Sequence, residues 1–312
     1  MSPKVSIILL NLNQERLTRE CIRSLQNLSY KEVEIILIDN GSTDGSGARI
    51  HAEFPSVAYR HFDKNLGFSE GNNAGMRIAF ERGAAYVLLL NNDTIVDPHF
   101  IEPLLEFDST NNKIGAQCGK IYYLSEPQTL WYAGGNYSID KAVSAHRGMY
   151  EPDTGRYDAI EDTEFTTGCM MFIRRTVLDD VGLLDNSFFA YFEDADWCLR
   201  ARNLGYRIIY NPRARIWHEI SATSKVDSPA YLYLHMRNKI LMVHKHGRPG
   251  RWMLFLPYYL YFFGRHLLRK AIWHRSWTGI QAIIAGIRDG LTGYTAENGE
   301  GRLRRFASAE IN

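Results

Sequence analysis

The sequence predicts an α/β fold, in which a mostly parallel sheet has helices on both faces and is followed by a helical extension. Two observations lead to this prediction. Short apolar runs alternate with stretches of helical spacing along the first hundred residues, and this alternation is typical of βαβ units. Acidic residues are then absent from Ser228 to Arg288, a stretch that holds ten of the 36 Lys and Arg residues.

Apolar runs predict four strands in the first part of the chain. They cover Lys4 to Asn13, Val33 to Asp39, Val57 to Phe62 and Ala85 to Asp93. A helix is expected over Glu15 to Leu28, where Leu17, Cys21, Ile22 and Leu25 have helical spacing, and further helices should follow the second and third strands. Alternation of strands and helices at this spacing implies a parallel sheet with helices on both faces.

The second part of the chain is less regular. Between about Gly119 and Thr167 the periodicity weakens, which predicts either a loop-rich insert or antiparallel strands. A strand-to-helix pattern returns at "GCMMFIRRTVLDDVG", and "EDADWCLRARNLGYRIIY" predicts a helix followed by a strand. The change in charge sets a domain boundary near Ser221.

The composition is that of a soluble globular protein, with 45% hydrophobic and 23% charged residues in a chain of 312. The length suits one large domain or two ordinary ones. No signal-peptide pattern precedes the first strand. The cysteines form no CxxC pair, which argues against a zinc site or a disulfide framework and fits a reducing cytoplasm. They are Cys21, Cys118, Cys169 and Cys198.

The basic extension permits two interpretations. Its apolar run from Trp252 to Gly264 is too short for a transmembrane helix, which needs about 20 residues, and Pro257 is expected to interrupt it. Basic and aromatic residues flank the run, as in segments that lie on an anionic membrane. Alternatively, the run is part of a helical pair that packs on the sheet domain or on a second subunit.

Common nucleotide-binding loops are absent. A dinucleotide fold needs GxGxxG after its first strand, but this position reads "NLNQER" and has no glycine. The Walker pattern GxxxxGK[ST] is missing too. A sugar-nucleotide pyrophosphorylase would also need a Gly-rich basic loop at this position, and none is present. The sheet therefore serves another type of ligand.

Amide and acidic residues recur where the predicted strands end, and ligands of open α/β sheets bind at this edge. They are Asn11, Asn13, Asp39, Asn65 and Asp93. Each alone is explained as a turn former or helix cap. As a set, they call for an explanation in terms of a ligand.

The ordered motifs resemble the inverting family 2 glycosyltransferases of the GT-A fold. The resemblance covers Lys4 to His218, through "VSIILLNLN", "ILIDNGSTDGS", "NLGFSEGNNAG", "LLLNNDTIVDP", "TTGCMMFIRR" and "FFAYFEDADWCLRARNLGYRIIYNPRARIWH". The segment "YLYLHMRNKILMVHKHG" is further similar to rhamnosyltransferase-type members, which build bacterial surface polysaccharides. This similarity makes dTDP-rhamnose a candidate donor.

The resemblance implies roles for the strand-end residues. The DxD motif of the family falls on Asn91-Asn92-Asp93, so that Asp93 binds a divalent metal, Mg²⁺ or Mn²⁺, while Asn91 and Asn92 face the ribose or the sugar. The first position is an amide here, which should weaken the metal site. His218 is the expected second ligand. Asp39 should accept a hydrogen bond from the nucleobase, and the nucleoside pocket should be lined by Asn11, Asn13 and Asn65.

The same resemblance assigns the chemistry to "YFEDADW". An inverting transfer is a single displacement, in which one carboxylate deprotonates the acceptor hydroxyl. The family places this base at Asp194, and Glu193 and Gly168 on the acceptor side. The alternative explanation is an acidic helix N-terminus, where Asp and Glu favour the helix dipole. Both can hold at once.

The resulting expectation is a GT-A catalytic domain over residues 1–220 and a basic, aromatic-rich extension over residues 221–312. Its partners would be a nucleotide-diphosphate sugar and a glycan or polyprenyl-diphosphate-linked glycan acceptor, with no nucleic acid. The extension would contact the inner face of the cell membrane or form a homodimer. The alternatives are a nucleotidyltransferase on a similar sheet and a sugar-nucleotide-binding protein without catalytic activity.

Overall fold

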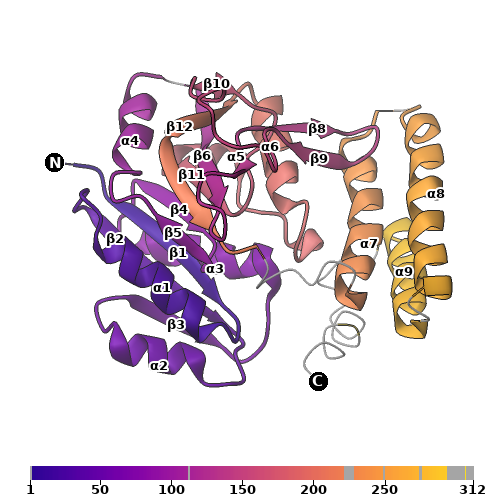
Figure 1. The fold of residues 1–312 in the computed structure, drawn as a ribbon, viewed down its shortest axis with the longest axis horizontal. Helices are drawn as coiled ribbons and strands as arrows, with labels where there is room; N and C mark the ends of the chain where they lie inside the picture. The colour runs from indigo at the N-terminus through magenta and orange to yellow at the C-terminus, as the bar shows by residue number, and fades with distance from the viewer. Residues whose placement is uncertain are drawn as a thin grey trace. The chain divides into compact units, whose positions relative to one another are not determined.

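The computed structural model describes residues 2–111, 113–220, 228–248, 250–273, 276–293 and 306. The chain divides into two compact units (Figure 1). The sheet unit comprises Met1–Asn136, Ala145–Leu184 and Asp194–Ala222, and the helical unit comprises Tyr137–Ser144, Asp185–Glu193 and Thr223–Asn312. The expected boundary near Ser221 lies outside the described residues and stays a prediction.

One large sheet forms the core of the sheet unit. Its main path has the order β10-β12-β6-β11-β4-β1-β2-β3, while β5 pairs with β12 and β7 pairs with β6. A separate two-stranded sheet joins β8 and β9. The strands are β1 Val5–Asn11, β2 Val33–Asn40, β3 Ala58–Phe62, β4 Tyr86–Leu90, β5 Thr94–Val96, β6 Ile114–Tyr123, β7 Leu130–Tyr132, β8 Gly135–Ser138, β9 Val143–His146, β10 Glu161–Asp162, β11 Met170–Arg174 and β12 Arg207–His218.

The four strands predicted for the first part of the chain are present and parallel. β1 lies between β2 and β4, and β3 pairs with β2. The strand order therefore reverses beside β1, which makes the carboxyl end of β1 a switch point where an open sheet binds its ligand. The register brings Asn11 beside Asp39 and Leu9 beside Leu90. The fold class predicted from the sequence is confirmed.

Helices connect and cover these strands. They are α1 Glu15–Gln26, α2 Ser46–Glu53, α3 Gly67–Glu81, α4 Glu102–Ser109, α5 Arg175–Val181 and α6 Glu193–Asn203. The predicted apolar positions of α1 are buried, although α1 ends at Gln26 and not at Leu28. α3 packs closely on β1, because a Cβ atom at Gly75 would come within 2.4 Å of Ile8 Cγ2. Figure 1 shows α1 and α2 beside the strands β1 to β3.

The irregular stretch between Gly119 and Thr167 contains strands. β7 and β10 are antiparallel to β6 and β12, respectively, and β8 and β9 form the small sheet. Of the two structures expected for this stretch, antiparallel strands are therefore found. β11 also runs antiparallel, between β4 and β6.

Three long helices form most of the described part of the helical unit. They are α7 Pro229–His246, α8 Trp252–Leu268 and α9 Trp277–Leu291, with a π-helical turn at Arg269–Trp273. α7 and α9 approach closely, since a Cβ atom at Gly286 would lie 2.4 Å from the carbonyl oxygen of Tyr233. The hydroxyl group of Tyr233 also donates a hydrogen bond of 2.8 Å to Asp289 on α9.

The expectation that Pro257 interrupts the apolar run is wrong. α8 continues through Pro257 to Leu268. The proline costs one backbone hydrogen bond, while Phe255 and Tyr259 on either side of it are buried and hold the helix in place. Among the described residues, no helix has the length and apolar character needed to cross a membrane.

Candidate active site

Asp39 is the most connected of the predicted nucleoside-pocket residues. Only 2% of its surface is exposed. One carboxylate oxygen accepts hydrogen bonds from Asn11 Nδ2 at 3.4 Å and from the Ser42 N–H at 3.3 Å. The other lies 3.2 Å from the Tyr59 hydroxyl group and 2.9 Å from His61 Nδ1. The carboxylate is therefore fixed at the carboxyl end of β2.

Asn11 serves mainly to hold this edge of the sheet together. Its Nδ2 atom donates to Ser42 at 3.0 Å and to Ser46 at 2.9 Å, besides Asp39. Its Oδ1 atom accepts from the Thr18 hydroxyl group at 3.0 Å. Because Asn11 is fully buried and both ends of its amide are engaged, it positions Asp39 and the loop before α2.

Asn13 and Asn65 shape the loops on either side of Asp39. Asn13 has a φ of 54° and accepts a hydrogen bond from the Thr43 N–H at 2.9 Å. Asn65 accepts from the Gly67 N–H at 2.8 Å and from Asn40 Nδ2 at 3.1 Å. Both side chains form turns at the predicted pocket, and their direct contact with a nucleoside stays a prediction.

The three residues after β4 have different environments. Asn92 is buried, and its Nδ2 atom donates to Thr18 at 2.7 Å. Asn91 is half-buried, and its Nδ2 atom lies 3.5 Å from Nε2 of His218. Asp93 is buried and lies 3.0 Å from the same Nε2 atom, measured to Oδ1. Asn91 and Asp93 thus both reach His218, whereas Asn92 points to α1.

The fold brings together the two predicted metal ligands, which are 125 positions apart in the sequence. His218 ends β12, whose last three residues pair with β5, directly after Asp93. The Glu219 N–H donates to the Asp93 carbonyl at 2.8 Å and fixes this junction. Among the described residues, no group of three or more His, Cys, Asp or Glu side chains could hold a metal.

Asp194, the predicted base, is half-buried in the first turn of α6. One carboxylate oxygen accepts from the Gly168 N–H at 2.9 Å, and the other accepts from the Ala195 N–H at 2.7 Å. Burial raises the pKa of Asp194 above its ordinary value, although these two N–H groups act in the opposite direction. The backbone of Gly168 therefore orients Asp194. Glu193, the first residue of α6, is buried.

Sequence reasoning missed several residues around these positions. Thr18 joins Asn11 to Asn92, and Tyr59 and His61 reach Asp39 from β3. Burial, with the Asp39 carboxylate nearby, raises the pKa of Tyr59 to about 12. The alternation of Tyr59 and His61 on one face of a strand was the available signal. This alternation identifies Tyr59 and His61 as neighbours of Asp39 only when the pairing of β3 with β2 is known.

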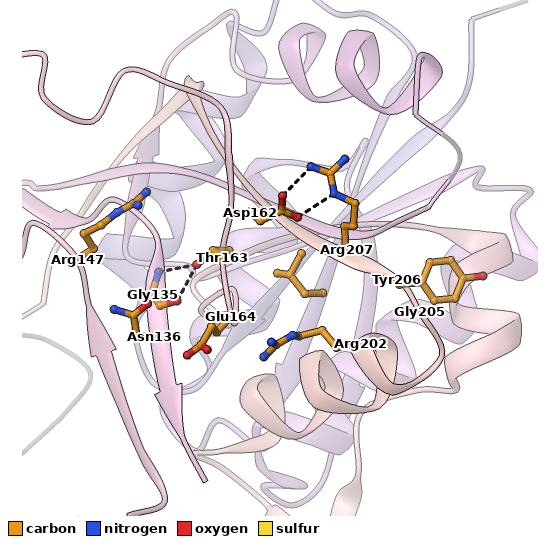
Figure 2. Close-up of a pocket in the computed structure, with 11 residues that line it drawn as sticks. Gly135, Asn136, Arg147, Asp162, Thr163, Glu164, Arg202, Gly205, Tyr206 and Arg207 are labelled. Carbon is orange, nitrogen blue, oxygen red and sulfur yellow. Dashed lines mark hydrogen bonds and ion pairs between the residues drawn. The ribbon is translucent and has the colours of Figure 1, made fainter.

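A separate cavity of about 400 Å³ lies in the sheet unit but away from these residues. Its wall includes Arg207, the first residue of β12, whereas His218 is the last. Figure 2 shows Arg207 paired with Asp162 through two contacts, of 2.8 and 2.7 Å. This cavity is therefore at the opposite end of β12 from the predicted metal ligands.

Comparison with known proteins identifies the family. The family described as "Glycosyl transferase family 2" matches residues 6–182, which is more than half of the chain. The chain belongs to glycosyltransferase family 2. The match includes the strand-end residues from Asn11 to Asp93. Asp194 and His218 lie beyond its end.

Two curated relatives of this family 2 glycosyltransferase are each 26% identical to it. One is the "Low-salt glycan biosynthesis hexosyltransferase Agl10" of Haloferax volcanii, over 77% of this chain and 76% of the relative. The other is the "N-acetylglucosaminyl-diphospho-decaprenol L-rhamnosyltransferase" of Mycobacterium tuberculosis, over 75% and 83%. The resemblance to rhamnosyltransferase-type members is confirmed.

Solved structures agree with the GT-A fold of this family 2 glycosyltransferase. The mannosyltransferase PcManGT of Pyrobaculum calidifontis, in complex with GDP-Man and Mn²⁺, has a TM-score of 0.56 at 14% identity and covers 93% of this chain and 88% of its own. GalNAc-T7 with UDP, GalNAc and Mn²⁺ has a TM-score of 0.62 at 14% identity and covers 96% and 58%.

Proposed function

We propose that the protein is an inverting glycosyltransferase that moves a sugar from a nucleotide diphosphate to a hydroxyl group of a polyprenyl-diphosphate-linked glycan. The observation that carries the proposal is the buried Asp93–His218 pair beside the switch point of the sheet, next to the Asp39 network. This edge offers a fixed acceptor for a nucleobase and a site for a charged diphosphate. Relatives of rhamnosyltransferase type, one of which is named for dTDP-rhamnose, make this the first donor to test.

The Asp93–His218 pair fits a divalent cation. Two ligands bound at right angles, each about 2.1 Å from the ion, lie about 3 Å apart, and the two side-chain atoms are 3.0 Å apart. A carboxylate with an imidazole suits Mn²⁺ better than Mg²⁺. A bound cation would neutralise charge on the diphosphate leaving group. With one carboxylate in the pair, substrate oxygens must provide much of the remaining coordination.

Asp194 is the proposed general base. Its carboxylate is held by two backbone N–H groups and has a raised pKa. A raised pKa makes a carboxylate a stronger base, which helps it to accept a proton from an acceptor hydroxyl group. As the proton moves to Asp194, the acceptor oxygen bonds to the anomeric carbon and the nucleotide diphosphate leaves.

A surface of α8 supports contact with an anionic membrane. Exposed apolar side chains follow one face of this helix, which we call the apolar face: Met253, Leu254, Leu256, Leu260, Tyr261 and Leu268. Arg265 and Arg269 are exposed on the same helix and at its end. An apolar face with basic residues beside it is typical of helices that lie in the membrane interface. Such contact would bring the enzyme to a lipid-linked acceptor at the inner face of the membrane.

Replacing Asp194 by Asn tests the assigned base. The variant is nearly isosteric, but an amide cannot accept the proton, so transfer at saturating donor should fall by about 10²–10⁴-fold. Donor affinity, measured by calorimetry, should stay the same. Glu193→Gln, at the neighbouring residue, is the matched control, and it should lower the rate of transfer less than Asp194→Asn does. Wild-type transfer by Asp194→Asn, together with loss in Glu193→Gln, would show that the base is Glu193.

The pH profile gives a second readout of the same variant. Asp194 acts only when it is ionised, so kcat should fall as the pH decreases through its pKa. Because this pKa is raised, the fall should begin above the ordinary range of Asp, about 3.9. The acidic limb should be absent from the residual activity of Asp194→Asn.

A further inference from the structure

The backbone just before α6 is strained. Phe189, Tyr191 and Phe192 have φ of 64°, 68° and 77°, and they are three of the six non-glycine residues with positive φ in the described part of the chain. Bulky side chains rarely adopt this left-handed region. Phe189, with a ψ of −60°, is also the centre of a γ-turn, because the Ala190 N–H donates to the Phe188 carbonyl at 2.8 Å. Strain of this kind persists only where the surroundings enforce it.

Asn238 on α7 holds the carbonyl groups of this segment. Its Nδ2 atom lies 3.1 Å from the carbonyl oxygen of Phe188 and 2.9 Å from those of Ala190 and Tyr191. Its Oδ1 atom accepts a hydrogen bond of 2.9 Å from Nε of Arg237. Since Asn238 is fully buried, water cannot replace these contacts when they are lost.

Arg237 holds the same segment, starting one residue earlier in the sequence. Its Nη2 atom donates to the carbonyl groups of Ser187 at 2.9 Å and Phe188 at 2.7 Å. The guanidinium group is fully buried over the ring of Tyr233. Burial of a guanidinium group is unfavourable unless it is hydrogen-bonded, so these carbonyl groups stabilise Arg237 while it fixes them. Arg237 and Asn238, with these contacts, are called the loop clamp below.

Ring contacts from α7 add to the loop clamp. The centroid of the His235 ring lies 4.8 Å from that of Tyr191 and 5.4 Å from that of Phe192. His235 also stacks on Tyr231, one turn earlier, at 3.9 Å. Burial lowers the pKa of His235 to about 3, so the ring is neutral. Tyr191 is thus fixed through both its backbone and its side chain, and Phe192 is fixed through its side chain.

The clamped segment leads directly into the proposed base. α6 begins at Glu193, immediately after Phe192, and Asp194 follows. The orientation of the first turn of a helix depends on the dihedral angles of the residues that enter it. All partners of the loop clamp belong to the helical unit, which includes Asp185–Glu193. The helical unit therefore controls the backbone from which the catalytic turn starts.

We propose that Arg237 and Asn238 are positioning residues for sugar transfer. Their hydrogen bonds hold the carbonyl groups of Ser187, Phe188, Ala190 and Tyr191 so that Asp194 enters α6 in the orientation that proton transfer requires. Neither side chain needs to touch the substrate. The inference rests on the proposed function, in which Asp194 is the base.

The first test separates kcat from donor binding in Asn238→Ala. The donor is the nucleotide sugar that most stabilises the full chain in a thermal-shift panel of dTDP-, UDP- and GDP-sugars. The acceptor is a short-chain polyprenyl-diphosphate N-acetylglucosamine. We expect kcat to fall by about 10–100-fold, as for a small misplacement of a catalytic group, while donor affinity changes less than about twofold. An unchanged kcat overturns the proposal.

A double-mutant cycle distinguishes positioning from a general loss of structure. If Asn238 acts through Asp194, Asn238→Ala should change little in an Asp194→Asn background. If the fold-losses in kcat of the two single variants multiply in full in the double variant, the proposal is overturned. Met242→Ala, at another buried position of α7, is the control for destabilisation and should lower kcat only as far as it lowers the folded fraction.

Arg237→Lys provides a second variant if Asn238→Ala does not fold. Lysine keeps the charge but lacks the fork of donors that reaches two carbonyl groups, so kcat should again fall at unchanged donor affinity. The two proposals fail separately. Full transfer by Asp194→Asn contradicts the proposed base, whereas full transfer by Asn238→Ala and Arg237→Lys, next to an inactive Asp194→Asn, contradicts the loop clamp alone.

Discussion

At the scale of single residues, the candidate site holds two fixed carboxylates, one proposed for the nucleobase and one for a cation that would meet the diphosphate. Asp39 and Asp93 are both buried, at the carboxyl ends of β2 and β4. Asp39 contacts the ring of His61 on β3, whereas Asp93 contacts that of His218 on β12. This difference predicts that the two carboxylates contribute separately to donor binding.

Loss of the Asp93 carboxylate should remove the metal-dependent part of nucleotide binding. Even the loss of a group that supports a metal ligand costs about 10–100-fold in affinity. Asp93→Asn and His218→Ala should therefore each weaken Mn²⁺-dependent binding of dTDP, UDP or GDP, whichever binds, by about tenfold or more. Titration calorimetry with the diphosphate and with the nucleoside separates the two parts, and nucleoside affinity should be unchanged.

Asp97→Asn is the matched control for this measurement. Asp97 lies four residues after Asp93, where Oδ1 accepts a hydrogen bond from the His99 N–H at 2.8 Å. The Asp97→Asn variant should bind metal and nucleotide as the unmodified protein does. Equal Mn²⁺-dependent binding by Asp93→Asn and His218→Ala would remove both residues from the metal site.

At the scale of helices, close approach between α7 and α9 supports the loop clamp. Gly286 and Gly290 face α7, where a Cβ atom would come within 2.4 Å of the Tyr233 carbonyl oxygen and 2.9 Å of Ile240, respectively. The contact involves the backbone of α7, so a side chain at Gly286 cannot be accommodated without separating the helices. α9 thereby sets the position of α7.

Gly286→Ala should destabilise the helical unit by about 1–3 kcal/mol, the usual effect of overpacking. Hydrogen exchange of the α7 and α9 amides measures this local stability. Gly264→Ala on α8 is the control, because its Cβ atom meets nothing within 4 Å. This variant should gain up to about 1 kcal/mol from helix propensity. Faster exchange in both variants would contradict the packing argument.

Periodicity predicted β1 to β4, β11 and β12 and the helices beside them, because each of these patterns is local, but it did not predict β6 or α4. It also placed Asn11, Asp39 and Asp93 at one edge, since parallel strands end at the same side. It could not predict that Thr18 joins two strand ends, or that an asparagine and an arginine of α7 bind a segment about fifty residues earlier. These contacts depend on pairing and packing over long separations, which no periodicity encodes.

At the scale of the whole molecule, charge and apolar surface are divided between the two units. The stretch from Ser228 to Arg288 is basic throughout, and the apolar face of α8 lies within it. The carboxylates of the candidate site, Asp39, Asp93 and Asp194, belong to the sheet unit. The proposed attraction to an anionic membrane would therefore act on the helical unit, and the carboxylates of the site would take no direct part in it.

The apolar face should bind vesicles that contain phosphatidylglycerol. Each side chain that leaves water contributes about 1 kcal/mol or more, so the triple variant Met253→Ser, Leu260→Ser, Tyr261→Ser should bind more than about tenfold less tightly in a sedimentation assay. Salt should weaken binding of the unmodified chain, because it screens exposed charges. Leu204→Ser, an exposed leucine of the sheet unit, should bind normally.

Two results would contradict membrane contact. One is that the full chain ignores these vesicles at low salt. The other is a homodimer in solution that the triple variant dissociates, which would mean that a second copy covers the apolar face. Pure phosphatidylcholine vesicles provide the control for the contribution of lipid charge.

The discontinuous helical unit also has a consequence for the order of events during synthesis. The segment Asp185–Glu193 belongs to the same compact unit as α7. It leaves the ribosome well before the two residues of the loop clamp, which are on α7. At about 5–20 residues per second, the 44 positions between Glu193 and Arg237 take roughly 2 to 9 s to translate. By the end of this interval the nascent chain contains every described strand of the sheet, the last being β12, but under the loop-clamp proposal it would not yet hold the turn that carries Asp194. A newly synthesised chain would thus form its donor pocket before it is able to transfer sugar.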